Sequence, residues 1–151
     1  MSKGYEMSAL RESQIERAYV VAQAAMPALS LDCWRTAGGT DLERRRFTVA
    51  RSSNGYIRGL CFARIFQHPV ASRLLDIPIF VVISPTDEDR IAQDLFSLMK
   101  RRAADAGCNY MRFWSIASEN WERLSDREFC SRWDHGLVYR LEQAFHNGVW
   151  R

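Results

Sequence analysis

The sequence has few of the features that mark special classes of protein. Its longest apolar run covers seven residues, 77–83, whereas a helix needs about 20 to span a bilayer. Its four cysteines, Cys33, Cys61, Cys108 and Cys130, are scattered and form no C-x-x-C pair. This spacing excludes a disulfide framework and a zinc knuckle, and it predicts buried free thiols and no metal.

An excess of charge of one sign is also missing. The chain has 21 Lys and Arg against 18 Asp and Glu, a net charge of +3, which is too balanced to predict nucleic-acid binding. The first six residues lack the apolar core of a signal peptide, so we expect a cytoplasmic protein with no membrane partner. With 151 residues, 47% of them hydrophobic, the chain is expected to form one domain over 1–151.

Helix and strand patterns alternate along the chain. Apolar residues recur at helical spacing before Pro27, and alternating patterns typical of strands follow from Phe47 onward. Asn54-Gly55 predicts a tight hairpin turn with two left-handed residues, and Pro78, inside a strand, predicts a sheet edge or a bulge. In chain order we expect a strand at 7–10, helices at 15–26 and 31–37, strands at 47–49, 56–66 and 74–83, a helix through 91–103, a strand at 110–116, an interrupted helix at 121–133, and strands at 137–141 and in the tail near Phe145 and Trp150.

This order predicts the fold class. Antiparallel hairpins come first and a β-α-β crossover follows, which is typical of an α/β protein with a mixed sheet. Because helices both precede the hairpins and lie within the crossover, they are expected on both faces of the sheet. No G-x-S-x-G motif and no histidine pair at metal-ligand spacing is present, so the sequence gives no sign of a serine hydrolase or a metalloenzyme.

The layout resembles the GNAT superfamily, the Gcn5-related N-acetyltransferases. Residues 75–83 look like the fourth strand of that family, and 91–100 with 106–108 look like its third helix. The pattern Ile116-x-x-x-Asn120 is similar to the family's link from the fifth strand to the fourth helix. Gly136-Leu137 stands where many members have Gly-Phe. The resemblance covers nearly the whole chain.

The resemblance implies a mostly antiparallel sheet with a splayed strand pair that binds acetyl-CoA. It implies an N-acyltransferase that moves an acetyl group to a small-molecule or protein amine, and it allows a homodimer through the C-terminal strands. The start of a helix suits the pyrophosphate, because its first amides lack partners. The residues implied for the cofactor are Val81, Val82 and Ile83 through their backbone, then Arg90, Ile91, Ala92 and Gln93, and finally Asn120.

The resemblance also implies candidates for catalysis and for the acceptor pocket. Asp76 lies near the position where many members carry a glutamate that acts as the general base. Tyr139 is a candidate for the residue that protonates the leaving thiolate. Trp34 and Trp114 are candidates for the wall of an apolar acceptor pocket. For the tyrosine and the tryptophans the alternative is packing within the sheet or the core.

The loop before the third helix departs from the family pattern. Asp87, Glu88 and Asp89 place three carboxylates where the family binds the pyrophosphate, and Arg90 stands in place of a glycine. Acidic residues at a helix start also stabilise the helix through its dipole. A second interpretation therefore stays open, in which the chain is a catalytically inactive GNAT-fold module that binds a ligand or a protein.

Overall fold

The structure of the protein is a computed structural model that describes residues 4–141, 145–146 and 149–150. The helices are η1 (Glu12–Gln14), α1 (Ile15–Ala25), α2 (Leu31–Ala37), α3 (Asp41–Arg44), α4 (Glu88–Asp105), α5 (Asn120–Arg123) and α6 (Arg127–Ser131). The strands are β1 (Tyr5–Ala9), β2 (Phe47–Ser52), β3 (Ile57–His68), β4 (Ser72–Val82), β5 (Tyr110–Phe113), β6 (Leu137–Arg140), β7 (Phe145–His146) and β8 (Val149–Trp150).

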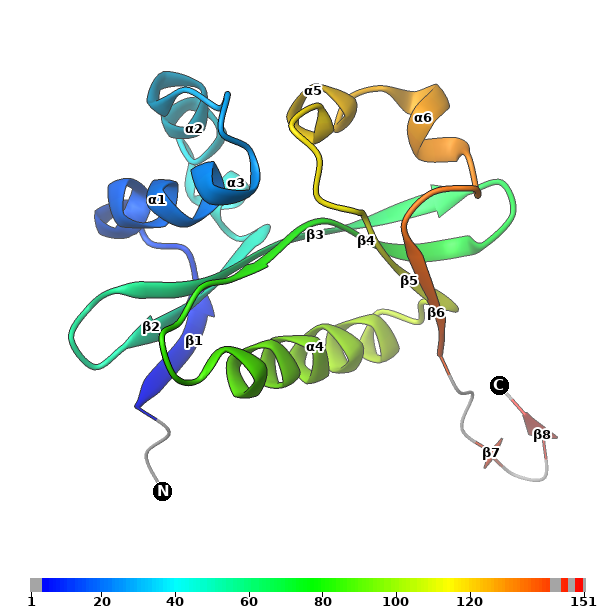
Figure 1. The fold of residues 1–151 in the computed structure, drawn as a ribbon. Helices are drawn as coiled ribbons and strands as arrows, with labels where there is room; N and C mark the ends of the chain where they lie inside the picture. The colour runs from blue at the N-terminus through cyan, green and yellow to red at the C-terminus, as the bar shows by residue number, and fades with distance from the viewer. Residues whose placement is uncertain (1–3, 142–144, 147–148, 151) are drawn as a thin grey trace.

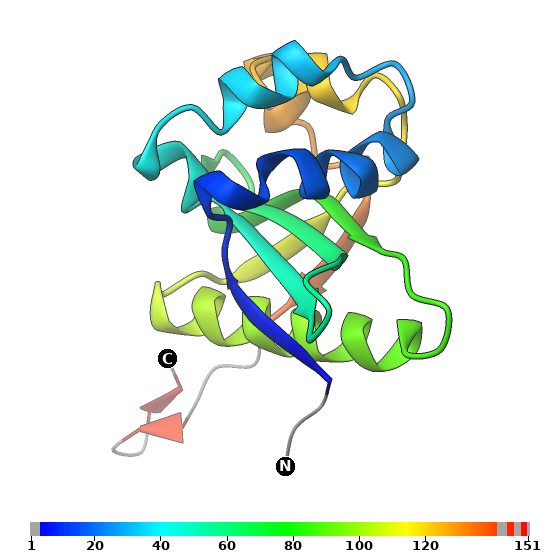
Figure 2. The same ribbon diagram turned by 90° about the vertical axis from the view of Figure 1, so that its left-hand side faces the viewer.

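The strands β1 to β6 form one sheet in the order in which they occur along the chain. Neighbouring strands are antiparallel except β4 and β5, which are parallel because α4 returns the chain across the sheet between them. Helices α1, α2, α5 and α6 cover one face and α4 covers the other (Figures 1 and 2). Strands β7 and β8 form a separate pair. The expected mixed, mostly antiparallel sheet with helices on both faces is confirmed.

Helix α4 packs closely on the sheet through one apolar stripe. Ile91, Leu95, Met99 and Ala103 recur every four residues and are all buried, as helical geometry requires of one face. Gly59 on β3 permits the close approach, since a Cβ there would lie 3.0 Å from Leu95 Cδ1. Among the described residues, no helix is both long and apolar enough to cross a bilayer.

Strand β4 contains a bulge at Pro78. Its register with β3 shifts between Phe62, which pairs with Ile79, and Arg64, which pairs with Asp76. One residue of β3 therefore faces two of β4, Pro78 and the residue before it, which defines a β-bulge. Proline fits there because it has no amide N–H to contribute to the ladder. The predicted bulge is confirmed.

Strands β4 and β5 separate just beyond this bulge. The last paired residues are Ile77 and Phe113, and the Trp114 amide donates a final hydrogen bond of 3.1 Å to the Ile77 carbonyl. Strand β4 continues to Val82 and then leads to α4, whereas the chain after β5 turns to the opposite face and enters α5 (Figure 1). The expected splayed strand pair is confirmed.

Two local predictions were wrong. The hairpin between β2 and β3 is not a two-residue turn: residues 53–56 connect the strands, and of these only Gly55 has a positive φ, 88°. The longer loop needs one left-handed residue instead of two. Cys33 is exposed, because it lies on the outer side of α2, whereas the other three cysteines are buried and all four are free. Burial raises the pKa of Cys61 to about 12.

Candidate functional site

The edge of β4 beyond the bulge faces the gap left by β5. The Ile83 amide donates a hydrogen bond of 2.7 Å to the Arg58 carbonyl on β3. Backbone groups alternate in direction along an antiparallel strand, so Val81 also faces β3, whereas Phe80 and Val82 turn theirs toward the gap. Of the three residues predicted to bind a cofactor through their backbone, only Val82 is therefore directed at the gap.

The first turn of α4 begins beside this edge. The amides of residues 88–90 have no acceptor within the helix, as at every helix start. The Ile91 amide already donates to the Asp87 carbonyl at 2.9 Å, and Ala92 and Gln93 lie deeper in the helix. The unpartnered amides therefore lie earlier than predicted, and of the four residues implied at the helix start only residue 90 contributes one.

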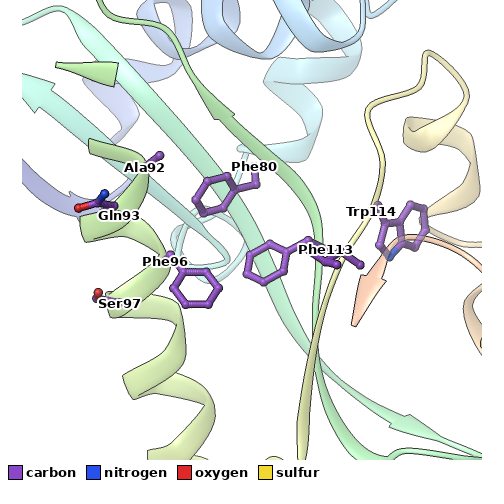
Figure 3. A pocket seen from close by; sticks show the side chains of 8 residues that line it. Phe80, Ala92, Gln93, Phe96, Ser97, Phe113 and Trp114 are labelled. Atoms are coloured by element: carbon purple, nitrogen blue, oxygen red, sulfur yellow. The ribbon is translucent and has the colours of Figure 1, made fainter. Parts of the chain in front are cut away.

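A cavity of about 610 Å³ lies between α4, β4 and β5, within the range of about 300–1,000 Å³ typical of ligand pockets. Its walls are largely aromatic (Figure 3). Phe113 on β5 contacts Phe80 on β4 edge to face at 5.4 Å and stacks on Phe96 of α4 at 5.5 Å between ring centroids. The other lining residues are Ala92, Gln93, Ser97, Trp114 and Leu137.

A second, much smaller cavity of about 10 Å³ lies on the α1 side of the same gap. Phe80 lines both cavities, so they lie on the two sides of the opening between the strands. The buried Asn120 lines the small one, and its Nδ2 donates to the Ser115 carbonyl at 2.8 Å. This bond fixes the loop after β5. The remaining lining residues are Ala25, Met26, Pro78, Ile79, Val81, Ile116 and Ala117.

Asp76 lies at the centre of a buried row of charges. The register places Arg64, Asp76 and Arg112 side by side on β3, β4 and β5. Arg112 Nε donates to Asp76 Oδ1 at 2.9 Å, and Trp114 Nε1 donates to the same oxygen at 2.8 Å. Arg64 Nη2 lies 3.6 Å from Oδ2. Asp76 and Arg112 have no exposed surface, so the carboxylate is surrounded by protein groups and does not contact solvent.

The same arginines hold the segment that contains α5 and α6. Arg112 donates to the carbonyls of Arg132 at 2.7 Å and of Cys130 at 2.9 Å. Arg64 donates to the Leu124 carbonyl at 2.6 Å. Hydrogen bonds from charged donors are stronger than neutral ones. These bonds therefore help to hold the α5–α6 segment against the sheet, in addition to its apolar contacts.

The two tryptophans predicted to line one pocket are separated. Trp34 is 1% exposed, donates from Nε1 to the Ile15 carbonyl at 2.7 Å and contacts Phe47 edge to face at 5.1 Å. It belongs to the core beneath α1 and α2 and lines neither cavity at the gap, which favours core packing, the alternative interpretation of this residue. Trp114 lines the larger cavity, oriented by its bond to Asp76.

Tyr139 lies behind the wall of the larger cavity. Its ring contacts Phe96 edge to face at 5.4 Å, and the Lys100 ammonium lies 5.4 Å from the ring centroid. The tyrosine is half-buried on β6. It therefore supports an aromatic side chain of the cavity, and the cation next to it adds a favourable contact with the ring face.

The acidic residues at the start of α4 are exposed, and one of them shares the face of the cavity. Asp89 precedes Ala92 by three residues and Phe96 by seven, which places all three along one side of the helix. Asp87 and Glu88 come just before it. The carboxylate of Asp89 is therefore the one of the three that is positioned beside the mouth of the cavity.

Arg90 lies on a different side of the helix. Burial, together with the hydrogen bond from its hydroxyl to Asp94, raises the pKa of Tyr5 on β1 to about 12, and the charge of Arg90 opposes this shift. Arg90 itself is exposed at the start of α4.

His135 packs against the wall of the cavity from outside. Its ring stacks on Phe129 at 4.1 Å and meets Trp114 edge to face at 5.2 Å. Its Nε2 lies 3.1 Å from the Phe129 carbonyl oxygen, so the neutral ring donates there. Burial lowers the pKa of His135, and the nearby charge of Arg112 lowers it further.

The lowered pKa predicts that the protein loses stability in acid. As the pH falls below about 6.5, the unfolded chain takes up the His135 proton before the folded chain does. The free energy of unfolding is therefore not reduced by this histidine above about pH 6.5. It decreases as the pH falls from there to the lowered pKa that His135 has in the folded protein. Urea unfolding at pH 8, 7, 6 and 5 should show a steeper decline for the wild type than for His135→Gln. Parallel curves would contradict the prediction.

Sequence reasoning missed the three phenylalanines of the larger cavity. Phe80, Phe96 and Phe113 fall on three different elements, and nothing in their local pattern separates them from core residues. The signal that could have found them is their distribution. Each lies on one of the three elements that the resemblance places around the splayed strands.

Comparison with known proteins gives matches in structure alone. No protein-family model and no curated protein matches the chain. The aminoglycoside N-acetyltransferase AAC(6')-Iy, solved in complex with CoA, superposes with a TM-score of 0.64 at 13% identity over 95% of this chain and 98% of that one. An acetyltransferase from Trypanosoma brucei superposes with a TM-score of 0.60 at 19% identity, over 91% of this chain and 99% of that one.

A third match places the same fold inside a longer chain. N-acetylglutamate synthase from Neisseria gonorrhoeae, complexed with CoA and N-acetyl-glutamate, gives a TM-score of 0.63 at 14% identity. The superposition covers 95% of this chain and 36% of that one. The splayed strands, the crossover helix and these superpositions agree, and the chain has the fold of the Gcn5-related N-acetyltransferases.

Proposed function

We propose that the chain binds CoA in the gap between β4 and β5 and transfers an acetyl group from acetyl-CoA to an amine. The observation that carries this proposal is the large aromatic cavity, which meets the unpaired edge of β4 at the gap. Acetyl-CoA supplies an activated acetyl group: the amide C–N bond forms, the thioester C–S bond breaks, and the proton leaves with the CoA thiol.

The chain offers groups suited to each part of such a ligand. The backbone of Phe80 and Val82 presents donors and acceptors to the amides of the pantetheine arm. The aromatic walls offer an apolar surface to its methylene groups. The free amides of residues 88–90 can donate to the pyrophosphate at the helix start, where the dipole also favours negative charge.

The acceptor is proposed to be a small-molecule or protein amine that approaches from the side of α1 and α5. That side holds the small cavity and the exposed Ile116. Asp76 is proposed to position Trp114 instead of acting as a base, because its carboxylate has no exposed surface and accepts hydrogen bonds from Arg112 and Trp114.

Calorimetric titration of the full chain with CoA tests the binding step directly. We expect saturable binding with a dissociation constant in the micromolar to millimolar range. A flat titration at millimolar CoA would overturn the proposal. Release of the CoA thiol from acetyl-CoA in the presence of a panel of amines then tests the transfer.

A second candidate function is a catalytically inactive GNAT-fold module that binds a ligand or a protein. The three exposed carboxylates at the start of α4 favour it, since they repel the pyrophosphate of CoA. The two functions separate in the same assays. A folded chain that binds no CoA, or that binds CoA and releases no thiol from acetyl-CoA with any amine, would support the module.

Removal of the Asp89 carboxylate is expected to strengthen CoA binding. A like-charge contact near 4 Å costs about 1 kcal/mol in a water-like environment, so Asp89→Asn should raise the affinity about fivefold. Asp105→Asn, at the far end of the same helix, is the matched control and should leave the affinity unchanged. Equal effects of both variants, measured by calorimetry at one salt concentration, would contradict the placement of the phosphates at this helix start.

A further inference from the structure

The two cavities beside the gap between β4 and β5 differ greatly in volume. The cavity on the α4 face has a volume of about 610 Å³, and the cavity on the α1 face has about 10 Å³. Phe80 lines both. A volume of that smaller size holds about one water molecule, which is close to the size of a methyl group.

The smaller cavity is lined in part by buried side chains of β4 and of the end of α1. Ile79 and Val81 of β4 are 3% and 7% exposed, and Met26 at the end of α1 is 2% exposed. The Met26 amide donates to the Ala22 carbonyl at 3.0 Å and its carbonyl accepts from the Leu29 amide at 2.9 Å. These bonds hold the backbone of Met26 in place, and the buried residues around its side chain restrict the room into which it can move.

We propose that the small cavity receives the acyl group and limits it to two carbons, and that Met26 sets this limit. The proposal rests on the proposed function, since it presumes an acyl-CoA in the gap. Protein interiors are packed like crystals, and each extra methylene group forced into them must displace side chains. A butyryl group adds two methylene groups to acetyl, and a cavity of about 10 Å³ accepts them only if its walls move.

The experiment compares CoA, acetyl-CoA and butyryl-CoA by calorimetric titration of the wild type and of Met26→Ala. The wild type should bind butyryl-CoA at least about tenfold more weakly than acetyl-CoA. Met26→Ala should reduce that ratio to about threefold or less. Met99→Ala is the matched control: Met99 is equally buried, in the core under α4, and lines neither cavity, so the wild-type ratio should persist.

A variant in the opposite direction keeps the test valid if Met26→Ala does not fold. Ala117 lines the small cavity from a loop and is only half-buried, so a larger side chain is tolerated there. Ala117→Leu should weaken acetyl-CoA binding about tenfold and leave the binding of CoA, which has no acyl group, nearly unchanged.

The outcomes separate the inference from the proposed function. Failure of the wild type to bind CoA overturns both. If the wild type binds CoA but binds acetyl-CoA and butyryl-CoA with equal affinity, the inference alone is overturned. An unchanged ratio in a folded Met26→Ala variant, or equal weakening of CoA and acetyl-CoA by Ala117→Leu, overturns the assignment of the small cavity as the acyl site.

Discussion

Replacement of Arg112 by alanine is expected to lower the free energy of unfolding by about 3–5 kcal/mol, the usual loss when one partner of a buried ion pair is removed. Arg112 has no exposed surface and donates to Asp76 and to the carbonyls of Cys130 and Arg132. The variant leaves a buried carboxylate and two carbonyls without these donors. Urea denaturation followed by circular dichroism measures the loss.

The chain supplies a matched control for this prediction. Arg132 and Asp134 form an ion pair with similar geometry, 2.8 Å between Nη2 and Oδ2, but both side chains are more than half exposed. Exposed pairs contribute little, because water screens them. Arg132→Ala should therefore leave the unfolding curve almost unchanged. Equal losses in the two variants would mean that burial does not decide how much such an ion pair contributes to stability.

Replacement of Ala92 by tryptophan is expected to weaken CoA binding by up to about 100-fold. Ala92 lines the larger cavity from α4, opposite Phe80 and Phe113, and an indole group at this position fills the space that the proposed ligand needs. Forcing a ligand into an overpacked site costs up to about 3 kcal/mol, which corresponds to a factor of this order. Calorimetric titration with CoA measures the change.

Ala104→Trp is the control for that variant. Ala104 is exposed on the same helix and lines neither cavity, so the same substitution there should preserve CoA binding. The thermal midpoints of both variants show whether the fold is intact. Tight CoA binding by a folded Ala92→Trp variant would mean that the ligand lies outside the aromatic cavity.

The order of the elements and the bulge in β4 could be predicted because they depend on local signals, whereas the splay of β4 and β5 was implied by the family resemblance. Pro78 has no amide N–H, and this property alone predicted an edge or a bulge within an apolar strand. The bulge also explains an error. An extra residue shifts the alternation of the backbone on β4, so the direction of the Val81 and Ile83 amides could not be read from the strand pattern.

The buried row of charges could not be predicted from the sequence for a related reason. Arg64, Asp76 and Arg112 are far apart along the chain, and only the registers of two strand pairs bring them together. The family resemblance, without this register, suggested Asp76 as a catalytic carboxylate. Likewise, the resemblance suggested that Trp34 lines a pocket, whereas its burial depends on how α1 and α2 pack on the sheet.

The way in which Arg64 and Arg112 hold the α5–α6 segment has a consequence for how the protein can diverge. Their hydrogen bonds end on the backbone carbonyls of Leu124, Cys130 and Arg132. Every amino acid carries that carbonyl, so side chains at these positions can be exchanged while the anchors remain. The attachment of the segment therefore does not depend on which side chains it exposes, and a lineage can change those side chains without rebuilding the support.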